Sequence, residues 1–162
     1  MKTLLIVYHT MTGGSRQMAE AAQRGAAAQE VHARLVRAQD ATANDLLQAD
    51  GYVFCTPENL ASMAGVMKDF FDRTFYAVLD RIIGRPYVTL VCAGSDGTNA
   101  VRQIDRICTG WRLKRVSEPL IVCTHAQTPE RILAPKTIGS EDLEKCAELG
   151  AAIAAGLALG IF

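Results

Sequence analysis

The chain has 162 residues, of which 49% are hydrophobic and 21% are charged, a composition typical of one globular domain with a sizeable core. Basic and acidic residues each total 17, and a net charge of zero gives no support to nucleic-acid binding. Aromatic residues make up 6%, too few for a base-stacking surface. No apolar run approaches the roughly 20 residues that cross a bilayer, and the N-terminal residues are interpreted as a strand rather than a signal peptide. We therefore expect a cytoplasmic protein without nucleic-acid or membrane partners.

Three strands are predicted in the first half of the chain. Residues 3–8 form a continuous apolar run that suits a strand buried on both faces. The alanine-rich segment 16–30 predicts a helix whose buried face carries Met18, Ala22, Gly25 and Ala26. The segments that follow predict a strand at 31–36, a short helix at 42–49 and an apolar third strand at 51–56, which Pro57 ends.

The second half continues the alternation of strands and helices. After a loop that runs to Met63, apolar residues recur at helical spacing and are interpreted as core or subunit-interface residues: Val66, Met67, Phe70, Phe71 and Phe75. The pattern then predicts a fourth strand at 85–93, a helix at 96–108 and a fifth strand at 115–124. Ser140 is predicted to cap a last helix with a buried stripe of Leu143, Cys146, Gly150, Ile153 and Leu157.

This alternation predicts an α/β fold over residues 1–162, with a five-stranded parallel sheet covered by helices on both faces. The irregular segment 125–139 is longer than most connections in compact domains. It follows the fifth strand at the carboxyl edge of the sheet, where such folds bind ligands. No metal site is predicted, because the five cysteines and three histidines are scattered without ligand spacing.

The first strand-to-helix turn, HTMTGGSR, is the most informative segment. It places the hydroxyl groups of Thr10, Thr12 and Ser15 around the adjacent glycines Gly13 and Gly14. Glycines allow close approach of an anion, and the following helix offers unpaired N–H groups, so the turn predicts a phosphate site without lysine. The adjacent glycines do not have the spacing of a dinucleotide-binding fingerprint, and the turn lacks the lysine that a P-loop needs. A phosphoacceptor domain would need an aspartate at the end of the third strand, where the sequence has CT.

Three segments together resemble one family. The turn HTMTGGS resembles the phosphate loop of the flavodoxin-like FMN proteins. The stretch TPENLASMAGVMKDFFDRTF is similar to one found in flavodoxin-like NAD(P)H-dependent FMN reductases and WrbA-type quinone oxidoreductases. The segment VTLVCAGSDG is similar to the glycine loop after the fourth strand of that family. The residues that match in the second stretch are Pro57, Met63, Gly65, Lys68, Phe70, Asp72, Arg73 and Thr74.

The resemblance implies a flavodoxin-like doubly wound sheet of strand order 2-1-3-4-5 with an FMN site made by three loops. The FMN phosphate would be held by Thr10, Thr12, Gly13, Gly14 and Ser15. The walls beside the flavin ring would be Pro57, Glu58, Asn59, Leu60, Ala61, Ser62 and Met63 on one side, and Ala93, Gly94, Ser95 and Gly97 on the other. No protein residue would be catalytic, because the flavin carries the chemistry.

The activity that the resemblance implies is an NAD(P)H-dependent FMN oxidoreductase. It would pass a hydride from NADH or NADPH through the flavin to a quinone or similar small acceptor, as a homodimer or homotetramer. In the long segment, His125, Arg131 and Lys136 are candidates for contacting the phosphates of NAD(P)H. Glu58 is interpreted either as a solvated acid or as a carboxylate beside the flavin, where it would disfavour an anionic reduced flavin.

Three alternatives stay open. A flavodoxin-type electron carrier without its own substrate would share the fold and cofactor, although such carriers tend to be strongly acidic and to place aromatics at the ring. The sequence departs from the family pattern at Leu60, Ala61 and Ala64, so another alternative is a domain that has lost flavin binding. The most remote is a serine hydrolase using Ser95, with Asp105 and His125 following in the order of an α/β-hydrolase.

Overall fold

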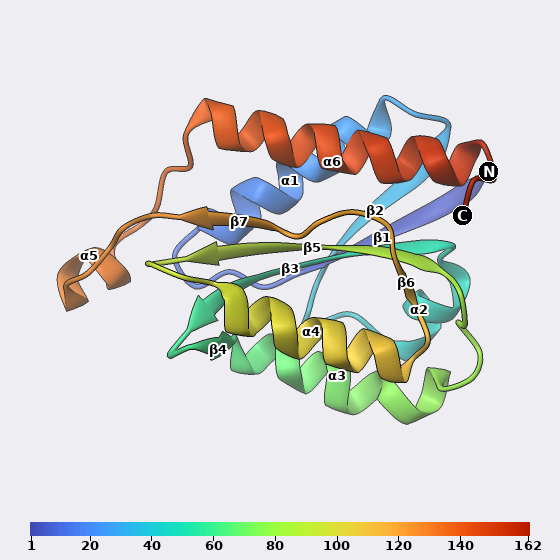
Figure 1. Cartoon of the computed structure of the whole chain (residues 1–162), viewed down its shortest axis with the longest axis horizontal. Coiled ribbons are helices and arrows are strands. Elements are labelled where there is room, and N and C mark those ends of the chain that lie inside the picture. The colour runs from blue at the N-terminus through green and yellow to red at the C-terminus, as the bar shows by residue number, and fades with distance from the viewer.

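Helices cover both faces of one twisted sheet in the computed structural model, which describes residues 1–162 (Figure 1). All the long strands of the sheet run parallel. In chain order the elements are β1 (Lys2–Tyr8), α1 (Gly14–Ala27), β2 (Val31–Arg37), α2 (Ala43–Gln48), β3 (Gly51–Asn59), β4 (Ser62–Met63), α3 (Gly65–Val78), β5 (Pro86–Ala93), α4 (Thr98–Gly110), β6 (Lys114–Arg115), β7 (Leu120–Cys123), α5 (Pro129–Leu133) and α6 (Ser140–Ala158).

The strand order confirms the predicted topology. Strands run β2-β1-β3-β5, and β5 then pairs with both β6 and β7. These last two are the predicted fifth strand, which is broken because Pro119 offers no N–H to the ladder just before β7 begins at Leu120. With the two pieces counted as one strand, the order is the expected 2-1-3-4-5.

The third strand does not end at Pro57, as the sequence had predicted, but continues to Asn59. The carbonyl of Cys55 accepts the N–H of His9, just past the end of β1, so Cys55 faces β1. Pro57, two residues further on, faces the same side beyond the end of β1, where no strand needs an N–H. On the other side of β3, Pro57 still pairs in register with Cys92 of β5.

Two apolar cores lie on the two faces of the sheet. One core is covered by α1 and α6, and the other by α2, α3 and α4, as Figure 1 shows. Phe70 and Phe71 are buried in the second core, which confirms their predicted packing role. Trp111 is fully buried beside them, and its indole N–H donates to the carbonyl of Phe75 at 3.0 Å.

The C-terminal part differs from expectation in two details. The segment predicted to be irregular contains the short helix α5, because Thr128 caps its first turn and Pro129 follows at the first helical position. Ser140 is the first residue of α6 and makes no side-chain cap; the N-cap is Gly139. No helix in the structure combines the length and apolarity needed to span a bilayer.

Candidate functional site

The first loop, between β1 and α1, forms a compact turn at the carboxyl edge of the sheet. Thr10 Oγ1 accepts the N–H of Gly13 at 2.9 Å, and Gly13 adopts φ 97° at the N-cap of α1. The N–H groups of Gly14, Ser15 and Arg16 have no acceptor within the chain. The loop therefore presents unpaired donors at the positive end of the α1 dipole.

Ser15 adds an unusual feature to this helix end. The residue is 1% exposed and its hydroxyl is buried, yet that hydroxyl has no hydrogen-bond partner. Buried hydroxyls without a partner are rare, because they lose their hydrogen bonds to water without replacing them. Such a hydroxyl beside the free N–H groups fits an anion that accepts several hydrogen bonds, and a phosphate monoester is one.

The second loop is a tight hairpin. Glu58 pairs with Met63 and Asn59 with Ser62, so the turn consists of Leu60 and Ala61, with φ of 50° and 60°. Two consecutive residues with positive φ are typical of a type I′ turn, which favours asparagine and glycine over leucine and alanine. The Leu60 side chain is fully exposed at the tip.

The hairpin is held against α4 by polar contacts that the sequence reasoning missed. The Glu58 carboxylate accepts the N–H of Gly97 at 2.9 Å and that of Ala100 at 3.1 Å. Gln103 accepts the N–H of Met63 at 2.8 Å, and Asn99 donates to the carbonyl of Ala61 at 2.5 Å. Glu58 is thus not a solvated acid: it lines the cleft, and its carboxylate caps α4.

The third loop lies between β5 and α4. It is tied to the end of β7, because the N–H groups of Thr124 and His125 donate to the carbonyls of Ala93 and Gly94, both at 2.8 Å. His125 takes a positive φ of 59° at this crossing. The loop is therefore fixed on both sides, by the Glu58 hairpin and by β7.

The three loops enclose a cleft built from two adjoining cavities of about 60 and 470 Å³. The smaller cavity reaches Thr12 and Cys92, and the larger reaches Leu60 and Ser95. Nine of the predicted site residues line the cleft, namely Thr12, Pro57, Glu58, Asn59, Leu60, Ala61, Ala93, Gly94 and Ser95.

The other predicted site residues lie around the cleft without lining it. Thr10 and Gly13 build the turn, and Gly14 packs against Cys92 and Ile138. Ser15 is buried behind the turn, and Gly97 is held by Glu58 at the start of α4. Ser62 and Met63 line a separate groove of about 420 Å³ that also involves α3 and α4.

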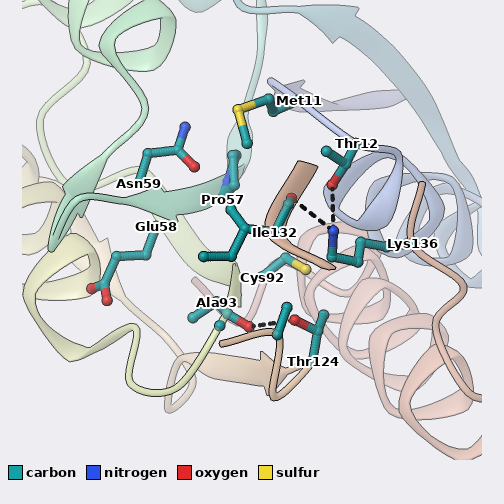
Figure 2. Close-up of a pocket in the computed structure, with 12 residues that line it drawn as sticks. Met11, Thr12, Pro57, Glu58, Asn59, Cys92, Ala93, Thr124, Ile132 and Lys136 are labelled. Carbon is teal, nitrogen blue, oxygen red and sulfur yellow. Dashed lines mark hydrogen bonds between the residues drawn. The ribbon is translucent and has the colours of Figure 1, made fainter. Parts of the chain in front are cut away.

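Residues of the segment between β7 and α6 line the same cleft. The sequence had not predicted that this segment would lie beside the first loop. Ile132 of α5 lines both cavities and lies in the middle of the labelled side chains in Figure 2. Lys136 lines the smaller cavity beside Thr12, with its ammonium 3.5 Å from Thr12 Oγ1. The sequence had placed this segment at the carboxyl edge of the sheet and named Lys136 only as a candidate contact for the phosphates of NAD(P)H.

Burial shifts the pKa values of two side chains near the cleft in the direction that favours their neutral forms. Burial raises the pKa of the Cys92 thiol to about 11, against the opposing effect of the Lys136 charge. Burial also lowers the pKa of His9, which favours its neutral imidazole. No cluster of three or more His, Cys, Asp or Glu side chains is arranged to hold a metal ion.

The structure does not assemble the serine hydrolase alternative. The Asp105 carboxylate accepts the Tyr87 hydroxyl at 2.8 Å and the Arg115 guanidinium at 3.0 Å. Tyr87 lies near the start of β5, whereas Ser95 follows the end of that strand. Asp105 is therefore committed at the opposite end of the sheet and does not orient His125.

Comparisons with known proteins agree with this arrangement. A family model described as flavodoxin matches residues 6–150. A flavodoxin of Aquifex aeolicus (strain VF5) is 34% identical over 59% of this chain and 50% of its own length. An NAD(P)H dehydrogenase (quinone) of Acidithiobacillus ferrooxidans is 33% identical over 46% of this chain and 48% of its own. The chain thus spans about half the length of these curated relatives.

A solved structure extends the likeness to the whole fold. The flavodoxin, WrbA-like protein from Agrobacterium tumefaciens superposes with a TM-score of 0.73 at 18% identity, covering 99% of both chains. This likeness concerns the fold, and the family model adds the sequence pattern across β1 to α6. On the strength of that match and of the three loops that meet at the sheet edge, the chain belongs to the flavodoxin family.

Proposed function

We propose that this protein binds FMN and acts as an NAD(P)H-dependent oxidoreductase with a quinone or similar small acceptor. The observation that carries the proposal is the phosphate cradle at the start of α1. There the N–H groups of Gly14, Ser15 and Arg16 are unpaired and the buried Ser15 hydroxyl has no partner, next to Thr12, which lines the cleft. When bound, the flavin supplies the redox chemistry, accepting a hydride from a nicotinamide and passing electrons to the acceptor.

The residues of the chain would bind the flavin nucleotide and orient its ring. The α1 cradle and Thr12 would hold the phosphate end, while the Glu58–Ala61 hairpin and the Ala93–Ser95 loop would form the walls of the larger cavity. The contacts from Glu58, Asn99 and Gln103 to their neighbours keep these walls in place without a ligand. Such preorganisation lowers the cost of ordering the site on binding.

Two observations favour a reductase over an electron carrier. The net charge is zero, so the chain lacks the strong charge that steers docking of a protein partner. The hairpin carries exposed Leu60 instead of an aromatic residue, which leaves the larger cavity open for a second small molecule. The quinone dehydrogenase relative supports the same class.

A carrier is the second candidate, because the Aquifex aeolicus flavodoxin matches a larger share of this chain than the dehydrogenase does, 59% against 46%. A carrier would hold the same flavin but would not react with a nicotinamide. The two functions therefore differ in one measurable step.

The test is a visible absorption spectrum after incubation with excess FMN and desalting. A retained flavin band that NADH or NADPH bleaches under anaerobic conditions supports the reductase. A retained band that only a chemical reductant bleaches supports the carrier. A colourless protein would overturn flavin binding altogether.

A variant with an added negative charge tests whether the FMN phosphate lies at the start of α1. Thr12→Asp places a carboxylate at the cradle, and we expect it to abolish retention of FMN by repulsion of the phosphate. The matched control is Thr98→Asp, the same change at the exposed first residue of α4, outside the cleft. Equal retention by both variants would contradict the assigned phosphate site.

A further inference from the structure

Lys136 has an environment unlike that of the other lysines near the surface. Its ammonium donates to the main-chain carbonyls of Ile132 at 2.9 Å and Ala134 at 2.6 Å. An ammonium has three donors, and the third faces Thr12 Oγ1 at a distance of 3.5 Å, which is long for a hydrogen bond. One donor of Lys136 is therefore left weakly bonded at the phosphate end of the cleft.

The positive charge of Lys136 has no carboxylate partner. No ion pair of the chain includes Lys136. Glu58 is the only acid that lines the same cavity, and its carboxylate is occupied by the N–H groups of Gly97 and Ala100. Figure 2 shows Glu58 pointing away from Lys136. A half-buried cation bonded only to neutral oxygens attracts an anion.

The main chain of Lys136 is clamped to the phosphate loop. Its N–H donates to the carbonyl of Thr12 at 2.8 Å. The Gln17 amide donates to the carbonyls of Gly13 at 2.8 Å and Lys136 at 2.7 Å, and its oxygen accepts the N–H of Ile138 at 3.0 Å. Lys136 takes part in these contacts only through its main-chain atoms, so they position the ammonium and also survive a change of the Lys136 side chain.

We propose that Lys136 donates to the phosphate of the bound flavin nucleotide and so makes the cleft selective for FMN over riboflavin. The inference rests on the proposed function and adds a lysine from a distant segment to the phosphate site that the sequence predicted without one. It also differs from the expected contact of Lys136 with the phosphates of NAD(P)H. The Lys136 ammonium beside Thr12 adds a full positive charge, which the neutral N–H donors of α1 lack.

The test compares FMN and riboflavin binding, measured by quenching of flavin fluorescence in low salt at pH 8. Lys136→Met keeps the aliphatic length but removes the charge. We expect FMN binding to weaken by about ten- to hundredfold, the usual effect of losing a charged hydrogen bond, and riboflavin binding to change by less than about twofold. Lys136→Arg should restore most of the selectivity.

Arg131→Met is the matched control, because Arg131 is an exposed cation of the same segment whose side chain has no hydrogen bond. It should leave both affinities unchanged. An unchanged FMN-to-riboflavin ratio in Lys136→Met would overturn the inference, whether both affinities fall or neither does.

Inorganic phosphate separates this inference from the proposed function. Phosphate should shift the amide resonances of Gly14, Ser15 and Arg16 in the unaltered protein at far lower concentration than in Lys136→Met. If the protein fails to bind FMN but shows this difference, the flavin function is wrong and the phosphate role of Lys136 stands. Equal phosphate binding by the two proteins would overturn the role of Lys136.

Discussion

Glu58 is a single side chain that joins two walls of the cleft. Its carboxylate receives two N–H groups at the start of α4, where the helix dipole favours a negative charge. In Glu58→Gln only one oxygen remains, and the amide N–H₂ faces the second donor. We expect the free energy of unfolding to fall by about 1 kcal/mol, measured in urea, and FMN binding to weaken as the walls loosen.

Glu118→Gln is the control for this change. The Glu118 side chain is 88% exposed and reaches Arg115 only at 3.5 Å. Exposed pairs of this kind contribute little, so the free energy of unfolding should change by less than about 0.5 kcal/mol. Equal unfolding midpoints for the two variants would contradict the capping role of Glu58.

At the residue scale, the sequence predicted which loops line the cleft but not the contacts that hold them together. Thr12 and Gly94 were predictable, because loops after parallel strands meet at one edge of a sheet. Glu58 finds its partners 39 and 42 residues further along the chain, and Lys136 meets Thr12 across 124 residues. No local periodicity links positions so far apart, so these roles needed the structure.

At the element scale, α2 depends on its N-terminal cap. Thr42 and Asp45 form a reciprocal capping box, and Asp45 also pairs with Arg34 at 2.7 Å. Burial acts to raise the pKa of Asp45, but the Thr42 hydrogen bonds and the Arg34 guanidinium outweigh it and hold the pKa below its usual value. The ionised form is therefore the one that stabilises the folded state.

Asp45→Asn should lower the free energy of unfolding by about 1 kcal/mol at pH 7. Because the folded pKa lies below the unfolded value of about 4, this stabilisation is complete above pH 4 and is lost as the pH falls through the folded pKa. Urea unfolding of both proteins between pH 7 and pH 2.5 should show the difference shrinking. The control is Asp72→Asn, because Asp72 forms an exposed i,i+4 pair with Lys68. If the difference in unfolding free energy between Asp45→Asn and the unaltered protein did not change with pH, the charge argument would be contradicted.

The elements themselves were largely predictable, since buried parallel strands are continuous apolar runs and the helices between them carry one apolar face. The errors occurred where tertiary context decides the local structure. Pro57 stays within β3 only because β1 has already ended beside it. The Leu60–Ala61 turn, with both φ values positive, has no turn-forming sequence, because its conformation is held by Gln103 and Asn99 of α4.

At the scale of the whole molecule, α1 and α6 cross at a pair of glycines. A Cβ on Gly150 would clash with the Ala22 carbonyl, and one on Gly25 would clash with the Ala147 carbonyl. The predicted buried faces of both helices included these glycines, but the backbone contact between them required the fold. The crossing matters for the proposed function because α1 carries the proposed phosphate cradle at its N-terminus.

Gly150→Ala distinguishes this packing from intrinsic helix propensity. Alanine is the better helix former by about 1 kcal/mol, so propensity alone predicts a more stable protein. The backbone clash predicts the opposite, a loss of about 2–3 kcal/mol and a fall in Tm of about 5–10 °C, with weaker FMN retention because α1 must move. Gly65→Ala is the control, since Gly65 opens α3 and a Cβ there meets no atom within 4 Å. Calorimetry of both variants tests the crossing, and a Gly150→Ala protein as stable as Gly65→Ala would show that α1 and α6 are not in backbone contact.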